Sequence, residues 1–385
     1  MRATTERHNF DSGDGDAEER DHIEWLLNEA RDEADKRRRC DLFLEALQRA
    51  RRAGALQLEL QALSFAVIYN IGVGYASTLL PYYWPYFKGL GERLSGLKSP
   101  QETHFLLWAG ERILYFAPEF WTIPRLELQR GMQEWTSATL VAGGYEPRAA
   151  LRLELHHCLR MGLSDKADSV MQALKNNESR DDLTPGASLL PGETTGFSGR
   201  RATNFGCNAY AHQIRVLYHC SKGDAQSAWH DASYLVEGLS SCALAMCAVA
   251  PREALAVLLE TLTRAGMHAR AESVHRLGLP MVLTMPEAVG WLGHHLRYMV
   301  QCGSIEEAKR LLDPLLEGED ETSAAESTGA TTPFQRFHFL RGAIEVLRAT
   351  RPASPLIRTF FSEAADLASR FDTRNGSDAF TKLLR

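Results

Sequence analysis

Residues 151–174, LRLELHHCLRMGLSDKADSVMQAL, have the spacing of two amphipathic helices joined by a short turn. Gly162 opens the turn, and Ala167 follows it five residues later, near the start of the second helix. The same arrangement returns in HQIRVLYHCSKGDAQSAWHDASYL (212–235), LAVLLETLTRAGMHARAESVHRLG (255–278) and LGHHLRYMVQCGSIEEAKRLLDPL (292–315). We predict that each glycine ends a helix in the left-handed conformation and that each alanine lets the two helices pack closely.

The four copies predict the architecture of the chain. Self-similar helix pairs of this length are typical of an α-solenoid, in which each pair packs on the next and the array binds other molecules. The four glycines are 61, 43 and 37 residues apart, so the repeats are irregular. In the first half Gly54 also separates two helix-like runs, but Glu59 stands where the alanine would be. We therefore predict an all-α fold, an irregular α-solenoid of antiparallel helix pairs.

Composition and charge limit the class of protein. The chain has 385 residues, 44% of them hydrophobic, which is enough for a long array with a substantial core. Its net charge of −6 is spread along the sequence and argues against a nucleic-acid partner. No apolar stretch is long enough to span a bilayer, and residues 1–24 lack the pattern of a signal peptide. Seven irregularly spaced cysteines fit reduced thiols, so we expect a cytoplasmic protein without membrane contact.

Composition also divides the chain into segments. We predict, in order, a disordered acidic tail, an N-terminal helical region with an aromatic cluster, the repeat region and a set of capping helices. Their bounds are 1–20, 21–145, 146–317 and 333–385. Two stretches rich in Gly, Ser, Thr and acidic residues, near 176–204 and 318–332, predict long exposed loops.

A glycine, four residues and an alanine across a helix–turn–helix resemble the tetratricopeptide-repeat family, over about residues 148–317. The sequence departs from the family at other positions. The small residue of the first helix falls at Leu155, Val216, Leu259 and Leu296, and the closing proline is missing from all four copies. The resemblance implies a TPR-like array in which the first helix of each pair lines a concave face.

That resemblance also implies which side chains face inward and meet a partner. They include Arg152, His156 and Arg160 in the first copy, Tyr210, Gln213 and Ser221 in the second, Glu253, Glu260 and Arg264 in the third, and Arg297 and Gln301 in the fourth. The predicted groove is polar and contains several arginines, which bind carboxylates through two parallel hydrogen bonds. An acidic protein segment or a C-terminal carboxylate is the partner that this groove would suit. The alternative is that these residues are solvated and paired with nearby acids.

An aromatic run lies in the N-terminal half, in which Tyr83 and Trp84 are central. Aromatic side chains dominate the energetics of many protein interfaces, so these two residues are candidates for contact with a second partner. Aromatic residues at helical spacing also form cores, and packing between the N-terminal helices is the alternative.

Motifs for catalysis or cofactor binding are not found in the sequence. The pairs His156–His157 and His294–His295 are adjacent on predicted helices, where neighbouring side chains point about 100° apart and chelate a metal poorly. Neither a phosphate-binding glycine loop nor a nucleophile motif occurs in a suitable context. We therefore predict no metal, no cofactor and no catalytic residue.

The sequence leads to a hypothesis of function with two alternatives. The leading hypothesis is a non-enzymatic scaffold or adaptor that binds a protein or peptide in the Arg-containing groove. The first alternative is a regulatory subunit of a bacterial signalling or defence system, which senses a peptide or a small-molecule ligand. The second alternative is a helical enzyme without a recognisable motif. The sequence does not indicate the oligomeric state.

Overall fold

The computed structural model describes residues 13–70, 83–95, 97, 100–142, 147–177, 208–240, 250–284, 289–316 and 332–384. Within these residues the regular structure consists of 18 α-helices and one short 3-10 helix, with no strand. The predicted all-α class is therefore confirmed. The predicted loops near 176–204 and 318–332 lie almost wholly outside the described residues, as does the start of the predicted tail. Residues 13–20 of that tail belong to the first helix.

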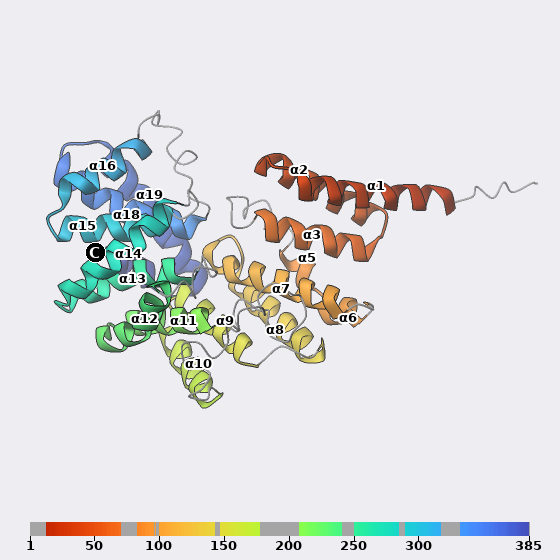
Figure 1. Ribbon diagram of the computed structural model, residues 1–385, viewed down its shortest axis with the longest axis horizontal. Coiled ribbons are helices and arrows are strands. Elements are labelled where there is room, and N and C mark those ends of the chain that lie inside the picture. The colour runs from red at the N-terminus through yellow and green to blue at the C-terminus, as the bar shows by residue number, and fades with distance from the viewer. Residues whose placement is uncertain are drawn as a thin grey trace, which may run out of the picture.

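The helices follow one another in the two halves that Figure 1 shows side by side. The N-terminal half contains α1 (Gly13–Asp32), α2 (Lys36–Arg52), α3 (Leu56–Asn70), α5 (Tyr83–Phe87), α6 (Leu90–Ser95), α7 (Pro100–Phe116), the 3-10 helix η3 (Ala117–Glu119) and α8 (Arg125–Ala142). The remaining helices are α9 (Pro147–Arg160), α10 (Ser164–Asn177), α11 (Asn208–Ser221), α12 (Ala225–Ser240), α13 (Ala250–Arg264), α14 (His268–Leu283), α15 (Val289–Gln301), α16 (Ile305–Leu316), α18 (Pro333–Thr350), α19 (Leu356–Asn375) and α20 (Ala379–Leu383).

The turns between paired helices have the conformation that the glycines predict. The four repeat glycines have φ between 67° and 83°, in the left-handed region. In the first turn the Leu163 N–H donates to the Cys158 carbonyl at 2.9 Å, which satisfies a carbonyl at the end of α9. The other three turns repeat this bond at 2.8 to 3.0 Å, and so does the turn at Gly54, at 2.9 Å. One turn geometry therefore joins five helix pairs.

The repeat alanines lie where the two helices of a pair meet. Ala167, Ala228, Ala271 and Ala308 are at most 1% exposed, so the predicted close packing is confirmed. The first helices of successive pairs also contact each other, α9 with α11, α11 with α13, and α13 with α15. Helix α15 in turn contacts α18. The first helices thus form a continuous layer of mutual contacts.

Helices α15 and α18 approach each other backbone to backbone. Gly293 and Gly342 face each other across this contact, and a Cβ on Gly293 would collide with the His338 carbonyl. A Cβ on Gly290 would lie 2.6 Å from the Gln335 Cα, closer than real Cβ atoms come to a backbone atom. Glycine is required here by close approach and not by its φ angle.

Two hydrophobic cores hold the helices together. The N-terminal core extends from α1 to α11 and contains Trp135, Tyr86 and Phe87 among its largest buried side chains. The C-terminal core extends from α11 to α20 and contains Phe337 and Phe371. The two cores meet at α11, so the first helices near the middle of the chain form the junction between them.

The C-terminal helices also reach back to the N-terminal half. The guanidinium of Arg374, near the end of α19, donates to the carbonyl oxygens of Pro118 and Phe120, each at 2.8 Å. Arg125, at the start of α8, donates to the Asn375 carbonyl at 2.8 Å. These bonds clamp the η3 segment against the end of α19.

Candidate functional site

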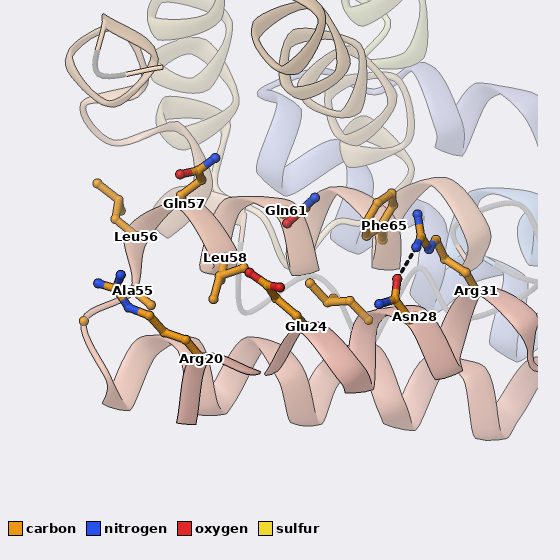
Figure 2. A pocket seen from close by; sticks show the side chains of 12 residues that line it. Arg20, Glu24, Asn28, Arg31, Ala55, Leu56, Gln57, Leu58, Gln61 and Phe65 are labelled. Carbon is orange, nitrogen blue, oxygen red and sulfur yellow. Dashed lines mark hydrogen bonds between the residues drawn. The ribbon is translucent and has the colours of Figure 1, made fainter. Parts of the chain in front are cut away.

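A cleft of about 470 Å³ lies between α1 and α3 (Figure 2). Helices α1 and α3 run side by side in the same direction, and helix α2 packs against both of them. The cleft is lined by the faces of α1 and α3 that α2 does not cover. The lining of α1 comes from residues at helical spacing, namely Arg20, Glu24, Leu27, Asn28 and Arg31. The lining of α3 and the turn before it comes from residues 54–58 together with Gln61 and Phe65.

The cleft has an apolar floor and a polar rim. Leu27 is buried, while Leu58 and Phe65 are half-buried. The Arg31 guanidinium lies 5.5 Å from the centre of the Phe65 ring and donates to the Asn28 side-chain oxygen. This arrangement holds Arg31 over the floor at one end of the cleft, whereas Arg20 stands at the other end (Figure 2).

Two charged side chains of the rim have no ionic partner among the residues that the structure describes. Arg20 and Glu24 are exposed, and neither takes part in an ion pair with any other described residue. Exposed arginines elsewhere are paired, as Arg351 is with Asp313 and Arg370 with Asp366, each at 2.7 Å. The charges of the cleft are therefore available to an external group.

A second cleft, of about 450 Å³, lies between α8 and the pair α9–α10, and its charged groups are already partnered. Lys166 and Glu154 form an ion pair at 2.8 Å within it. The His157 Nε2 lies 2.7 Å from the Leu114 carbonyl oxygen, and burial raises the pKa of the Cys158 thiol to about 11, which keeps the thiol protonated. The two opposite charges that line this cleft are therefore paired with each other, unlike Arg20 and Glu24.

Six residues of the predicted groove are at most 6% exposed, so they lie in the interior and not on an open face. They are Arg152, His156, Arg160, Tyr210, Gln213 and Glu253. Their contribution to partner binding stays a prediction. Their burial means that a partner could reach them only if the surrounding helices moved apart.

A group of buried charges lies around Arg160, at the junction of the two cores. The Arg160 Nη2 lies 2.5 Å from a Glu253 carboxylate oxygen and 3.3 Å from a Glu119 oxygen. Glu253 also accepts hydrogen bonds from the Tyr115 hydroxyl and the Gln213 amide, both at 2.8 Å. We call Tyr115, Glu119, Arg160, Gln213, Glu253 and Thr332 the Arg160 cluster, since the Thr332 hydroxyl donates to Glu119 at 2.7 Å.

Aromatic rings seal the Arg160 cluster from solvent. The guanidinium carbon lies 4.2 Å from the centre of the Phe334 ring and 5.2 Å from that of Trp291. Burial raises the pKa of Glu119 to about 7, against the opposing effects of Arg160 and the Thr332 hydroxyl. Burial and the nearby Arg160 charge hold the pKa of His156 well below its ordinary value. The cluster fixes the helices of the junction in place, with its polar groups directed at each other.

The sequence prediction did not include Glu119, Tyr115 or Thr332 in any site. For Glu119 a signal was present, because it is the single charge in the apolar run Phe116–Trp121, FAPEFW. A carboxylate in such a run predicts a buried group that needs a partner. The partner itself lies 41 residues away and could not be read from the run.

The other predicted site residues lie in different environments. Glu260 accepts from Arg297 at 2.7 Å, and Arg297 also donates to Glu345 at 2.6 Å. Burial would raise the pKa of Glu260, but the cations Arg341 and Arg297 outweigh it and hold the pKa below its ordinary value. Arg264 and Gln301 are exposed.

The aromatic run contributes mostly to the core. Tyr83 is buried with Tyr86 and Phe87, whereas Trp84 is half-buried. Of the two interpretations that the sequence left open, packing therefore applies to Tyr83. The interface role of both residues stays a prediction.

The described residues contain no group of three or more His, Cys, Asp or Glu side chains placed to hold a metal ion. Among the same residues, no helix has both the length and the apolar character needed to cross a membrane. Comparison with models of protein families, with curated proteins and with solved structures finds nothing that matches this chain.

Proposed function

We propose that the protein is a non-enzymatic binding module that takes a segment of another protein into the cleft between α1 and α3. The observation that carries this proposal is the combination of an apolar floor with charged and amide side chains on the rim. An apolar floor supplies binding energy by removing surface from water, and the rim fixes the orientation of what binds.

The electrostatics of the cleft favour it over the Arg160 cluster as the contact surface. Arg160 is buried and shared between two carboxylates, so a partner would have to replace strong existing interactions. Arg20 and Glu24 are exposed, and a partner would add ion pairs without breaking any between described residues. Arg264 and Gln301, which the sequence predicts to meet a partner, are exposed and are proposed as further contacts.

The proposal includes the architecture expected from the sequence. The repeated turn and the continuous layer of first helices support an irregular, TPR-like α-solenoid. Solenoids of this kind present grooves between neighbouring helices, and the cleft between α1 and α3 would be one such groove near the beginning of the array. The cytoplasmic location inferred from the cysteines is also part of the proposal.

A selection from a library of random peptides tests this function. Peptides are selected on the wild-type protein and then compared on two variants with an added tryptophan. Gln61→Trp fills the cleft, whereas Gln48→Trp adds the same side chain at an exposed position of α2 outside the cleft. We expect the selected peptides to bind the wild type and Gln48→Trp and to lose binding to Gln61→Trp. Peptides that bind all three proteins equally, or a selection that yields none, would refute the proposal.

A further inference from the structure

We infer that the cleft between α1 and α3 selects an extended peptide segment with an acidic, a basic and an acidic residue at alternate positions. The inference rests on the proposed function and names the ligand class for the same site. Arg20, Glu24 and Arg31 would each meet one charge of the segment. The charge order acid–x–base–x–acid is the same in both chain directions, so it holds for either orientation of the peptide.

The amide side chains of the rim favour an extended segment over a helical one. Asn28 and Gln61 carry both hydrogen-bond donors and acceptors, on opposite sides of the cleft (Figure 2). An extended chain offers its own backbone N–H and C=O groups to such partners, whereas a helix has already paired them. Half of the twelve residues that line the cleft are polar or charged. This composition disfavours an amphipathic helix, whose wide apolar stripe needs a mostly apolar groove.

The spacing of charges along α1 matches the repeat of an extended chain. Glu24 follows Arg20 by one turn of helix, a rise of about 6 Å at ~1.5 Å per residue. Residues on one face of an extended chain recur every ~6.6 Å, so the next residue on that face would reach Glu24. The Arg20 side chain points away from Glu24 in Figure 2, but no contact with a described residue holds it there, so it is free to turn toward the cleft. After that rotation, a peptide residue that meets Arg20 and its neighbour two positions on match the first two charges of α1.

The position of the Arg31 side chain extends this register to a third charge. Its guanidinium donates to the Asn28 side chain, and so it lies one turn nearer to Arg20 than its own Cα does. Asn28 is two turns from Arg20, about 12 Å, and the fifth residue of an extended segment is about 13 Å from the first. An acidic residue at that position would therefore reach Arg31.

The repeat of charges along the cleft also excludes simpler ligands of one sign. A run of acidic residues would place a carboxylate against Glu24, and a basic run would place cations against both arginines. Like charges in contact weaken binding, so the three side chains select order as well as net charge.

Fluorescence anisotropy with two labelled peptides of identical composition tests the inference. The first contains the segment DSKSE and the second the segment DSESK, at low salt and at raised salt. In the second peptide two of the three assigned contacts bring like charges together. Because each exposed ion pair contributes little, we expect the first peptide to bind only about tenfold more tightly than the second. Raised salt should reduce the difference.

Charge-reversal variants show whether the contacts are the ones assigned. Arg20→Glu with Arg31→Glu should remove the preference for DSKSE. Arg358→Glu, an exposed position on α19 at the other side of the molecule, carries the same type of change and should leave the preference intact. Glu24→Arg should transfer the preference to the all-acidic segment DSESE. Equal binding of the two peptides, or a preference that survives the Arg20 and Arg31 changes, would overturn the inference.

The outcome also separates this inference from the proposed function. Selected peptides that are sensitive to Gln61→Trp but lack the charge order would leave the binding function standing and overturn the inference. A selection without any peptide sensitive to Gln61→Trp would overturn both. Circular dichroism of each variant checks that the helix content is unchanged, since all of the substituted residues are exposed except the half-buried Gln61.

Discussion

Replacing Glu119 with glutamine should change the pH dependence of stability in a defined direction. Glu119 and Glu253 share the single guanidinium of Arg160, and Glu253 has the shorter contact with it. Glu253 also accepts hydrogen bonds from Tyr115 and Gln213, while Glu119 accepts only from Thr332 among the contacts described. Burial raises the pKa of Glu119 to about 7, so this carboxyl takes up a proton near neutral pH.

The sign and size of the effect follow from the pKa of Glu119. Burial raises this pKa from 4.5 to about 7, so the folded protein binds more protons here than the unfolded chain does between those values. The contribution of Glu119 to stability is complete below about pH 4.5 and is lost as the pH rises through about 7. A pKa change of this size corresponds to a loss of about 3 kcal/mol of unfolding free energy over this pH range.

Glutamine does not titrate, and it keeps an acceptor for the Thr332 hydroxyl. Between about pH 5 and pH 8 the Glu119→Gln variant should therefore gain about 3 kcal/mol of unfolding free energy relative to the wild type. For a chain of 385 residues unfolding as one unit, this equals about 4 °C in Tm. Urea unfolding of both proteins at several pH values measures the difference between their unfolding free energies. Groups that titrate in the same way in both proteins do not contribute to this difference.

The control is Glu306→Gln, which removes an exposed carboxylate of α16 outside the Arg160 cluster and should not reproduce the gain of about 3 kcal/mol. If the difference between Glu119→Gln and the wild type stayed constant with pH, Glu119 would not titrate in this range. The assignment of the proton to that carboxyl would then be wrong.

Three further substitutions have expected outcomes. Arg160→Ala leaves two buried carboxylates without their cation and should cost about 3–5 kcal/mol, measured by urea unfolding, and a loss under 1 kcal/mol would contradict the assigned pairing. Gly293→Ala puts a methyl group against the His338 carbonyl and should cost about 1–3 kcal/mol, whereas an unchanged Tm would mean that α15 and α18 are farther apart. Burial and the nearby cations lower the pKa of His294 to about 3, so its contribution to stability is present above about pH 6.5 and is lost as the pH falls. His294→Asn should therefore flatten the decline of Tm between about pH 6.5 and pH 5, and an identical decline in both proteins would show that His294 is not responsible.

The sequence predicted the parts of the fold that depend on neighbouring residues. A glycine between two helical runs determines a left-handed turn locally, and Gly162 and Gly303 have that conformation. The alanine five residues later lies in the same turn-to-helix unit, so its burial follows from the same short segment. The sequence predicts the first helical region from residue 21, whereas α1 begins at Gly13. Residues 13–20 are acidic and glycine-rich, so their composition resembles that of a solvated tail.

The candidate site depends on contacts that no local pattern contains. The stripe from Arg20 to Arg31 is visible in the sequence as helical spacing, but the cleft exists only because α3 lies beside it. The burial of Arg152 and Arg160 likewise depends on how closely successive first helices approach each other. The resemblance to an open repeat array suggested a groove at these positions, whereas large side chains such as Leu155 and Leu259 fill the layer between the helices.

The bonds from Arg374 to the η3 segment have a consequence for the order of folding during synthesis. They join residues 254 and 256 positions apart, so the segment around Pro118 leaves the ribosome long before its partner exists. Domains generally fold as their sequence emerges, and the N-terminal core has most of its helices by the time α9 is made. The η3 segment cannot form all of its hydrogen bonds at that early stage, because Arg374 has not yet been synthesised. The Phe120 carbonyl has a local donor in the Ile123 N–H at 3.3 Å, whereas the Pro118 carbonyl gains its Arg374 donor only when α19 is made. The hydrogen bonding of this segment is therefore completed together with the C-terminal helices.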